Sequence, residues 1–178
     1  MHVLLPLMRR MPASGSPIRE RNRARRGVDA VTVAMQGYAD RGVFRGFSVR
    51  RRGDRVEYRF TWMTPRPMTV AYDSKTHALT FRNVLPGVAS KSPLLAEARA
   101  LVEERTRNGF PAHRRIDARR ARVSLALHQG CVSLTLSIQG QHHQYAVKKA
   151  LNLVNELFVI LHATYPDYLA KNFGLPEE

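Results

Sequence analysis

Five arginines in two predicted hairpins have the spacing of side chains that share one face of a β-sheet. Successive side chains of a strand point to opposite faces, and these arginines alternate with apolar residues, so we expect them together: Arg50, Arg52, Arg55, Arg59 and Arg82. A guanidinium group donates paired hydrogen bonds to phosphate oxygens. A row of such groups can follow a nucleic-acid backbone, and its binding would weaken steeply with salt.

A second group of arginines lies in residues 110 to 122, the connection before the last two strands: Arg114, Arg115, Arg119, Arg120 and Arg122. We expect the two groups to form one anion-binding surface. Base stacking needs aromatic side chains on that surface, yet the hairpin aromatics have the opposite parity: Phe47, Tyr58, Phe60, Trp62, Tyr72 and Phe81. Only Phe44 falls on the arginine side. The expected contacts are therefore with phosphates of a duplex or of structured RNA, with little sequence preference.

No constellation typical of an enzyme or a cofactor site is present. His128 and Cys131 would face each other across a turn, but no further metal ligands follow at a fixed spacing. The adjacent His142 and His143 point in different directions on any regular element. Cys131 has no neighbouring acid or oxyanion donor that would make it a nucleophile, and the patterns GxGxxG and GxxxxGKS/T do not occur. The residues favour a non-catalytic binding module without a metal or cofactor.

The composition also indicates an anionic partner. The chain of 178 residues carries 29 Lys and Arg against 14 Asp and Glu, a formal net charge of +15, and the excess lies before residue 141. Such a field attracts nucleic acid, anionic lipid or an acidic protein. Of the 29 basic residues 24 are arginine, so a GC-rich coding sequence would also account for part of the charge.

Three hairpins must position these side chains. Their predicted strands are residues 45–52 and 55–62, 68–73 and 78–85, and 122–128 and 131–138, with turns at Gly53-Asp54, near Lys75-Thr76 and at Gln129-Gly130. Each hairpin has one apolar face and one polar face without a large apolar residue. That pattern predicts an antiparallel sheet of about six strands that is covered on one side.

Three helices are expected to supply the cover. Val28, Val31, Met35 and Tyr38 share a helix face, Ser92 and Pro93 begin a second helix that ends at Asn108-Gly109, and a long apolar stripe runs from Val147 to Tyr165. Pro166 begins a short terminal turn. The fold class is α+β, in the order α-β-β-β-β-α-β-β-α with the helices mainly on one face, and residues 28–178 form a single domain.

The last helix carries a second apolar stripe, Leu153, Leu157 and Ile160. The helix is therefore either deeply embedded or half of a homodimer seam. The element order resembles that of the secretion-chaperone-like fold, which has one strand fewer and is typically acidic. That resemblance implies a dimeric protein-binding module, so the alternative function is a homodimeric protein-interaction or chaperone-like adaptor.

Residues 1–27 hold three prolines, seven arginines and one acid, and we expect them to form a disordered basic arm. An arginine-rich, acid-poor leader is also typical of an organellar transit peptide. No apolar run approaches the roughly 20 residues of a membrane span, and the single Cys131 allows no internal disulfide. The cytoplasm is the expected location, with an organelle as the alternative.

Overall fold

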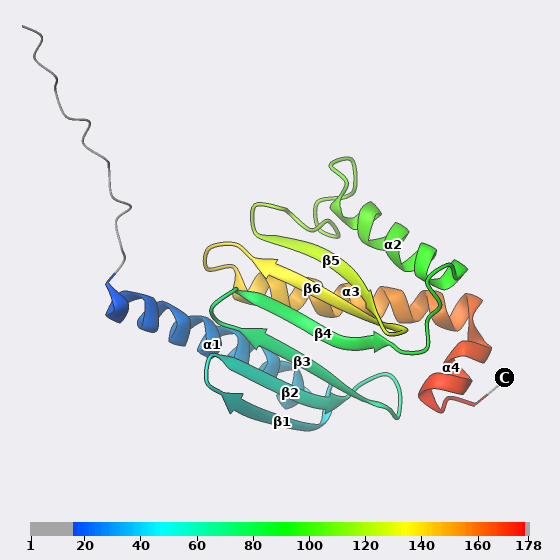
Figure 1. Ribbon diagram of the computed structural model, residues 1–178, viewed down its shortest axis with the longest axis horizontal. Coiled ribbons are helices and arrows are strands. Elements are labelled where there is room, and N and C mark those ends of the chain that lie inside the picture. The colour runs from blue at the N-terminus through cyan, green and yellow to red at the C-terminus, as the bar shows by residue number, and fades with distance from the viewer. Residues whose placement is uncertain (1–15, 177–178) are drawn as a thin grey trace, which may run out of the picture.

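The six predicted strands form one antiparallel sheet. The computed structural model describes residues 16–176, whose elements follow one another in the order α1 (Pro17–Asp40), β1 (Arg45–Arg52), β2 (Arg55–Thr61), β3 (Pro67–Asp73), β4 (Ala78–Leu85), α2 (Pro93–Thr106), β5 (Ala121–His128), β6 (Cys131–Ile138), α3 (His143–Thr164) and α4 (Pro166–Phe173). The strand order across the sheet is β1-β2-β3-β4-β6-β5 (Figure 1). The α+β class and the six-stranded sheet are confirmed, with four helices in place of three.

The hairpin registers follow the apolar alternation and the turns. Val49 pairs with Tyr58 and Leu127 with Val132, which are the partners that the predicted turns at Gly53-Asp54 and Gln129-Gly130 require. Gly53 and Gly130 take positive φ angles of 58° and 73° at the two tightest turns, a conformation that glycine adopts without the steric cost that Cβ imposes on other residues.

The start of β1 departs from the predicted register. The pairing shifts between Arg45 and Ser48, so that Arg45 lies opposite Thr61 rather than Trp62, and Gly46 has a φ of 62°. A β-bulge of this kind inserts one residue and reverses the side-chain parity beyond it. Phe44 is consequently buried and stacks on Phe60, with ring centroids 4.0 Å apart. The expectation that Phe44 lies on the arginine side was wrong.

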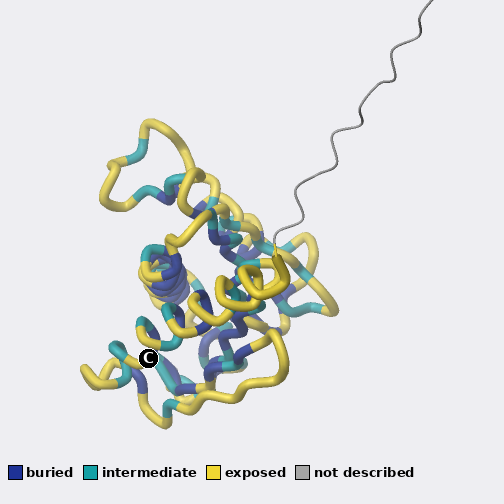
Figure 2. The backbone as a smooth tube through the Cα atoms, turned by 90° about the vertical axis from the view of Figure 1, so that its left-hand side faces the viewer, coloured by how far each residue is buried: buried dark blue, intermediate teal, exposed yellow. Residues whose placement is uncertain are grey.

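The helices cover one face of the sheet. In Figure 1 the sheet lies in front of α1 and α3, while α2 packs beside β5 and against α3. The buried residues of the strands and helices, dark blue in Figure 2, face one another between these two layers, and their side chains form one core. Its largest fully buried members include Tyr58, Tyr72, Phe60, Phe81, Met35 and Phe158. The opposite face of the sheet carries no helix among the residues that the structure describes.

The last long helix, α3, is deeply embedded. Leu153 and Leu157 are each 4% exposed and Ile160 is half-buried beside α2. The connection between α2 and β5 packs on the same side, where Lys149 Nζ donates a hydrogen bond to the His113 carbonyl at 2.8 Å and Tyr145 Oη accepts one from the Asp117 N–H at 2.8 Å. Burial lowers the pKa of Lys149. The second apolar stripe of α3 is thus filled by the chain itself.

Helix α1 begins three turns earlier than the sequence pattern indicates. Residues 17–27 were expected to be disordered, but they are helical from Pro17 onward. Proline is favoured at the first helical position, and no proline or glycine follows before Gly27. Residues 17–26 show no apolar period because nearly all of them are exposed. The expectation for residues 1–15 lies outside the described residues.

The terminal turn is a fourth helix. α4 buries Leu169 and Phe173, and it ends at Gly174, which has a φ of 66°. Tyr168 Oη donates a hydrogen bond to the carbonyl of Pro86 at 2.6 Å. This hydrogen bond ties α4 to the loop after β4.

Gly27 marks the point where α1 enters the core. A Cβ at this position would lie 2.6 Å from Tyr72 Oη and 2.9 Å from His143 Nε2. Tyr72 is fully buried and its hydroxyl is hydrogen-bonded, so it cannot move aside freely. Gly37 in the same helix has only the flexible end of Arg41 nearby, at 3.5 Å.

We therefore expect Gly27→Ala and Gly37→Ala to change stability in opposite directions. Alanine gains about 1 kcal/mol of helix propensity over glycine at either position. Overpacking at position 27 costs about 1–3 kcal/mol, so Gly27→Ala should lower the free energy of unfolding and Gly37→Ala should raise it. Urea denaturation followed by circular dichroism measures both. Equal stabilisation by the two substitutions would contradict the close packing at Gly27.

Candidate nucleic-acid interface

The face of the sheet that turns away from α1 and α3, here called the open face, is crossed by rows of paired residues. One row contains Arg52, Arg55, Asp73, Ala78, Ser137 and Arg122, each opposite the next. The next row contains Arg50, Glu57, Ala71, Thr80, Thr135 and Ser124. The register therefore places Arg50, Arg52, Arg55, Arg59 and Arg82 on one face, as the sequence predicts, and the bulge adds Arg45.

The charges of the open face are only partly paired. Arg55 bonds to Asp73 at 3.0 Å and Arg82 to Glu57 at 2.5 Å. Burial alone would raise the pKa of Asp73, but the hydrogen bonds from Arg55 and from two backbone N–H groups outweigh it and lower the pKa. Within the described chain, five arginines of this face form no ion pair: Arg45, Arg50, Arg52, Arg59 and Arg122.

The open face offers few groups that could stack on a base. By register its uncharged positions are small and polar, mainly Ser, Thr and Ala. The aromatic residues of β1 and β2 stack on one another beneath it, for example Phe47 on Tyr58 with centroids 6.2 Å apart. His128, at the far end of β5, is the nearest equivalent of a stacking ring. The face can contact phosphates but not a series of unstacked bases.

The structure separates the arginines of the connection from those of the open face. Arg114 forms an ion pair with Glu156 of α3 at 3.5 Å, and the Arg120 guanidinium lies 4.8 Å from the centroid of the Tyr145 ring, also in α3. Arg115 donates a hydrogen bond to the carbonyl of Asn108, just before the connection, and Arg119 donates one to the carboxylate of Asp117 within it. Of this group only Arg122 belongs to the open face, on the edge strand farthest from β1.

A hollow of about 310 Å³ lies where β3 and β4 separate. Glu57, Arg66, Arg82 and Asn83 line its polar side. The guanidinium of Arg66 is held 5.7 Å from the centroid of the Phe173 ring and donates a hydrogen bond to the backbone of α4. Sequence reasoning missed Arg66 because it precedes a proline in an irregular segment, where no periodicity assigns a side chain to a face.

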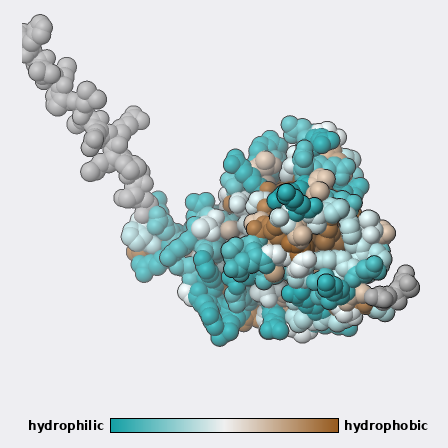
Figure 3. Space-filling view, turned by 45° about the vertical axis from the view of Figure 1, so that its right-hand side comes forward, coloured by the Kyte–Doolittle hydropathy of each residue, from teal (hydrophilic) through white to brown (hydrophobic). Residues whose placement is uncertain are grey.

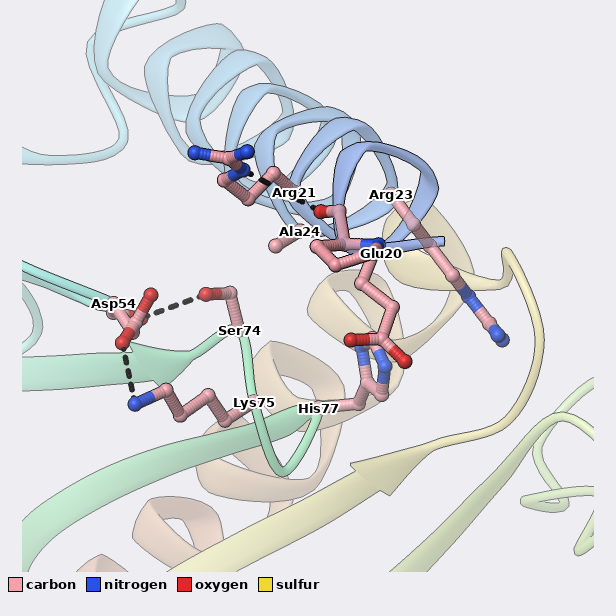
Figure 4. A pocket seen from close by; sticks show the side chains of 9 residues that line it. Glu20, Arg21, Arg23, Ala24, Asp54, Ser74, Lys75 and His77 are labelled. Atoms are coloured by element: carbon pink, nitrogen blue, oxygen red, sulfur yellow. Dashed lines mark hydrogen bonds and ion pairs between the residues drawn. The ribbon is translucent and has the colours of Figure 1, made fainter. Parts of the chain in front are cut away.

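A second group of polar residues lies at the other end of the sheet, beside α1. Tyr72 Oη is 3.0 Å from His143 Nε2 and 3.3 Å from His77 Nδ1. The adjoining pocket, of about 580 Å³, is lined by Glu20, Arg21, Arg23, Asp54, Ser74, Lys75 and His77 (Figure 4). Lys75 pairs with Asp54 at 2.8 Å. The cationic and anionic side chains are mixed, so the pocket does not favour one sign of ligand.

The candidate metal ligands do not come together. His128 and Cys131 pair across the β5–β6 turn, whereas His142 precedes α3 and His143 is buried in the core. Within residues 16–176, no group of three His, Cys, Asp or Glu side chains could hold a metal ion.

Burial sets the protonation of the Tyr72–His143 pair. It raises the pKa of Tyr72 to about 12. It also lowers the pKa of His143, as do the neighbouring charges of His77, Arg23 and His142, while a hydrogen bond to the backbone of Gln141 acts in the opposite direction. The phenol of Tyr72 therefore stays protonated and the imidazole of His143 stays neutral, and a hydrogen bond joins Tyr72 Oη and His143 Nε2.

This pair should make folding pH-dependent. An unfolded histidine has a pKa near 6.5, and the folded His143 binds its proton at a lower pH. The unfolded state then holds more protons below pH 6.5, so stability is complete above that value and falls as the pH falls. We expect the free energy of unfolding to decrease as the pH is lowered from 7 to 5.5. His143→Gln should flatten this dependence in urea titrations, and His162→Gln, an exposed control on α3, should not.

Comparison with known proteins gives no family assignment. No protein-family model, no curated protein and no solved structure matches the chain. The likeness of its element order to the secretion-chaperone-like fold therefore stays an expectation. Among the helices that the structure describes, none is long and apolar enough to cross a membrane.

Proposed function

We propose that the open face binds the phosphate backbone of a nucleic acid, either a duplex or structured RNA, and performs no catalysis. One observation carries the proposal: the open face, which no helix of residues 16–176 covers, holds seven arginines against two carboxylates, and five of these arginines form no ion pair within the described chain. A guanidinium without an ion pair can bind phosphate without first breaking an existing interaction. Arg45, Arg50, Arg52 and Arg59 are therefore the principal contacts.

The spacing of these arginines suits a polyanion. Arg50 and Arg52 lie on the same face two residues apart, about 6.7 Å along the strand. One strand of a duplex carries a charge for about every 3.4 Å of its axis, and its phosphates wind around that axis, so neighbouring phosphates lie farther apart than this rise and the two side chains can contact adjacent phosphates of one strand. Arg59 lies opposite Ser48 on the neighbouring strand, where it can reach the next phosphate across.

The rest of the face supports the same kind of contact. The hydroxyl groups of Thr80 and Thr135 lie 3.0 Å apart at its centre, and such groups bond commonly to phosphate oxygens in protein–DNA complexes. These contacts fix position and carry no base sequence. We expect binding that is weakly selective and strongly salt-dependent. A cytoplasmic or an organellar location would each be compatible with it.

The alternative, a homodimeric protein-interaction or chaperone-like adaptor, has less support. Its expected seam comprised Leu153, Leu157 and Ile160, but the first two pack inside the chain. A dimer through these residues would require α2 and the connection to move away. An acidic protein remains a second kind of anionic partner for the open face.

The experiment is a charge reversal on the open face with a matched control. The open-face variant is the triple substitution Arg50→Glu, Arg52→Glu, Arg59→Glu. The control is Arg99→Glu, Arg107→Glu, Lys171→Glu, which changes the net charge by the same amount at residues that lie exposed on or beside α2 and α4. Fluorescence anisotropy with a 20-base-pair duplex, at several salt concentrations, measures affinity for the wild type and both variants.

We expect the open-face variant to bind at least about 30-fold more weakly than wild type. Its salt slope should be smaller by about three units, because each of the three substituted arginines would otherwise neutralise one phosphate. The control should change affinity by less than about threefold, because charges beyond a Debye length are screened. Equal reductions of affinity in the two variants would show that only the net charge matters, and would contradict the proposal.

A further inference from the structure

The first ten residues of α1 form a second basic surface. From here on, the arm means residues 17–26 alone, and not the whole basic segment 1–27. All of them are exposed except Ala24, which is half-buried, and Gly27 is the first buried residue of the helix. The arm projects past the end of the sheet that holds the β1–β2 and β3–β4 turns (Figure 1). Hydrophilic side chains dominate this end of the molecule (Figure 3).

The arginines of the arm lie in two rows along the helix. An α-helix advances about 100° per residue, so Arg19, Arg23 and Arg26 share one side, and Arg21 and Arg25 share another about 150° away. The one acid, Glu20, lies on neither row: Figure 4 shows its carboxylate turned inward, toward His77. The outward strip between the rows carries Ile18 and Asn22. The arm therefore presents cations on two opposite flanks and no carboxylate on its outer side.

This arrangement matches a groove with phosphates on both walls. The major groove of B-form DNA, about 12 Å wide, admits an α-helix, whose diameter with side chains is about 10–12 Å. Ten helical residues extend about 15 Å, which is about four base-pair steps of 3.4 Å. The major groove of A-form RNA is too deep and narrow for side chains to read. A membrane surface is a poorer match, because a helix that lies on lipid needs an apolar face and the arm has only Ile18 and Ala24.

We propose that the arm inserts into the major groove of duplex DNA, with its two rows of arginines on the phosphates of the two groove walls. This is a second contact surface, separate from the open face, and it does not depend on binding by that face. The arm should also distinguish DNA from RNA, because it fits the major groove of B-form DNA and not that of duplex RNA.

The first measurement compares DNA with RNA. The variant Arg19→Gln, Arg21→Gln, Arg23→Gln, Arg25→Gln, Arg26→Gln keeps helix propensity, because Gln and Arg have similar values. Its control removes five exposed cations elsewhere: Lys91→Gln, Arg99→Gln, Arg107→Gln, Lys148→Gln, Lys171→Gln. Anisotropy is measured on the full chain with a 16-base-pair DNA duplex and with duplex RNA of the same sequence, and circular dichroism checks that the helix content is unchanged.

We expect the arm variant to lose at least about tenfold in DNA affinity and about three units or more of salt slope, while its RNA affinity changes by less than about threefold. The control should leave the difference between DNA and RNA unchanged. An equal decrease of affinity for DNA and for RNA in the arm variant would overturn the proposal, because it would show that the arm contributes only nonspecific electrostatic attraction. Weaker binding to phosphatidylserine vesicles with unchanged DNA affinity would overturn it as well.

The second measurement locates the arm on the duplex. Dimethyl sulfate methylates guanine N7 in the major groove and adenine N3 in the minor groove, so footprinting separates the two grooves. The wild-type chain and the open-face triple variant should both protect guanine N7, and the arm variant should not. If the open-face variant alone loses all binding, the arm proposal fails and the open-face proposal stands. If only the arm variant loses protection and affinity, the open-face proposal fails and the arm proposal stands.

Discussion

One-sided burial is the constraint on which the rest of the structure depends. α1, α2 and α3 pack on one side of the sheet and bury the apolar side chains of its strands, and no helix of the described residues covers the other side. Burying an apolar side chain is worth about 1.5–3 kcal/mol, so the apolar residues of the central strands face the core, and the residues of the other parity must be compatible with water. Arginine, serine and threonine satisfy that requirement. The open face is thus a consequence of how the core is built, and a binding partner would contact its charged side chains.

The sheet and its register could be predicted from the sequence because alternation and turn glycines are local signals. They predicted the pairing of Val49 with Tyr58 and of Leu127 with Val132, and they placed Arg50, Arg55 and Arg82 on one face. The bulge at Gly46 was missed because an inserted residue leaves the alternation on each side intact. A glycine inside a strand pattern was the one local sign of it.

The remaining errors have a different physical cause. Arg114 and Arg120 are directed by Glu156 and Tyr145, which follow them by 42 and 25 positions in the sequence, and no local pattern contains such information. The helical structure of the arm was missed for another reason. Hydrophobic periodicity reveals a helix only when one of its faces is buried, and residues 17–26 are almost entirely exposed. Ser16-Pro17, followed by nine residues without proline or glycine, was the only sign of a helix start.

The continuity of α1 has a mechanical consequence. The helix runs from its exposed tip to its buried half without a break, and at Gly27 it lies directly against the hydroxyl of Tyr72. Because α1 has no hinge between its exposed and buried halves, a sideways force on the exposed turns is transmitted as a torque to the place where the helix enters the core. A partner that binds the exposed first turns of α1 would therefore load the contact at Gly27, beside the hydrogen bond between Tyr72 and His143, and a change in that hydrogen bond would report the load inside the core.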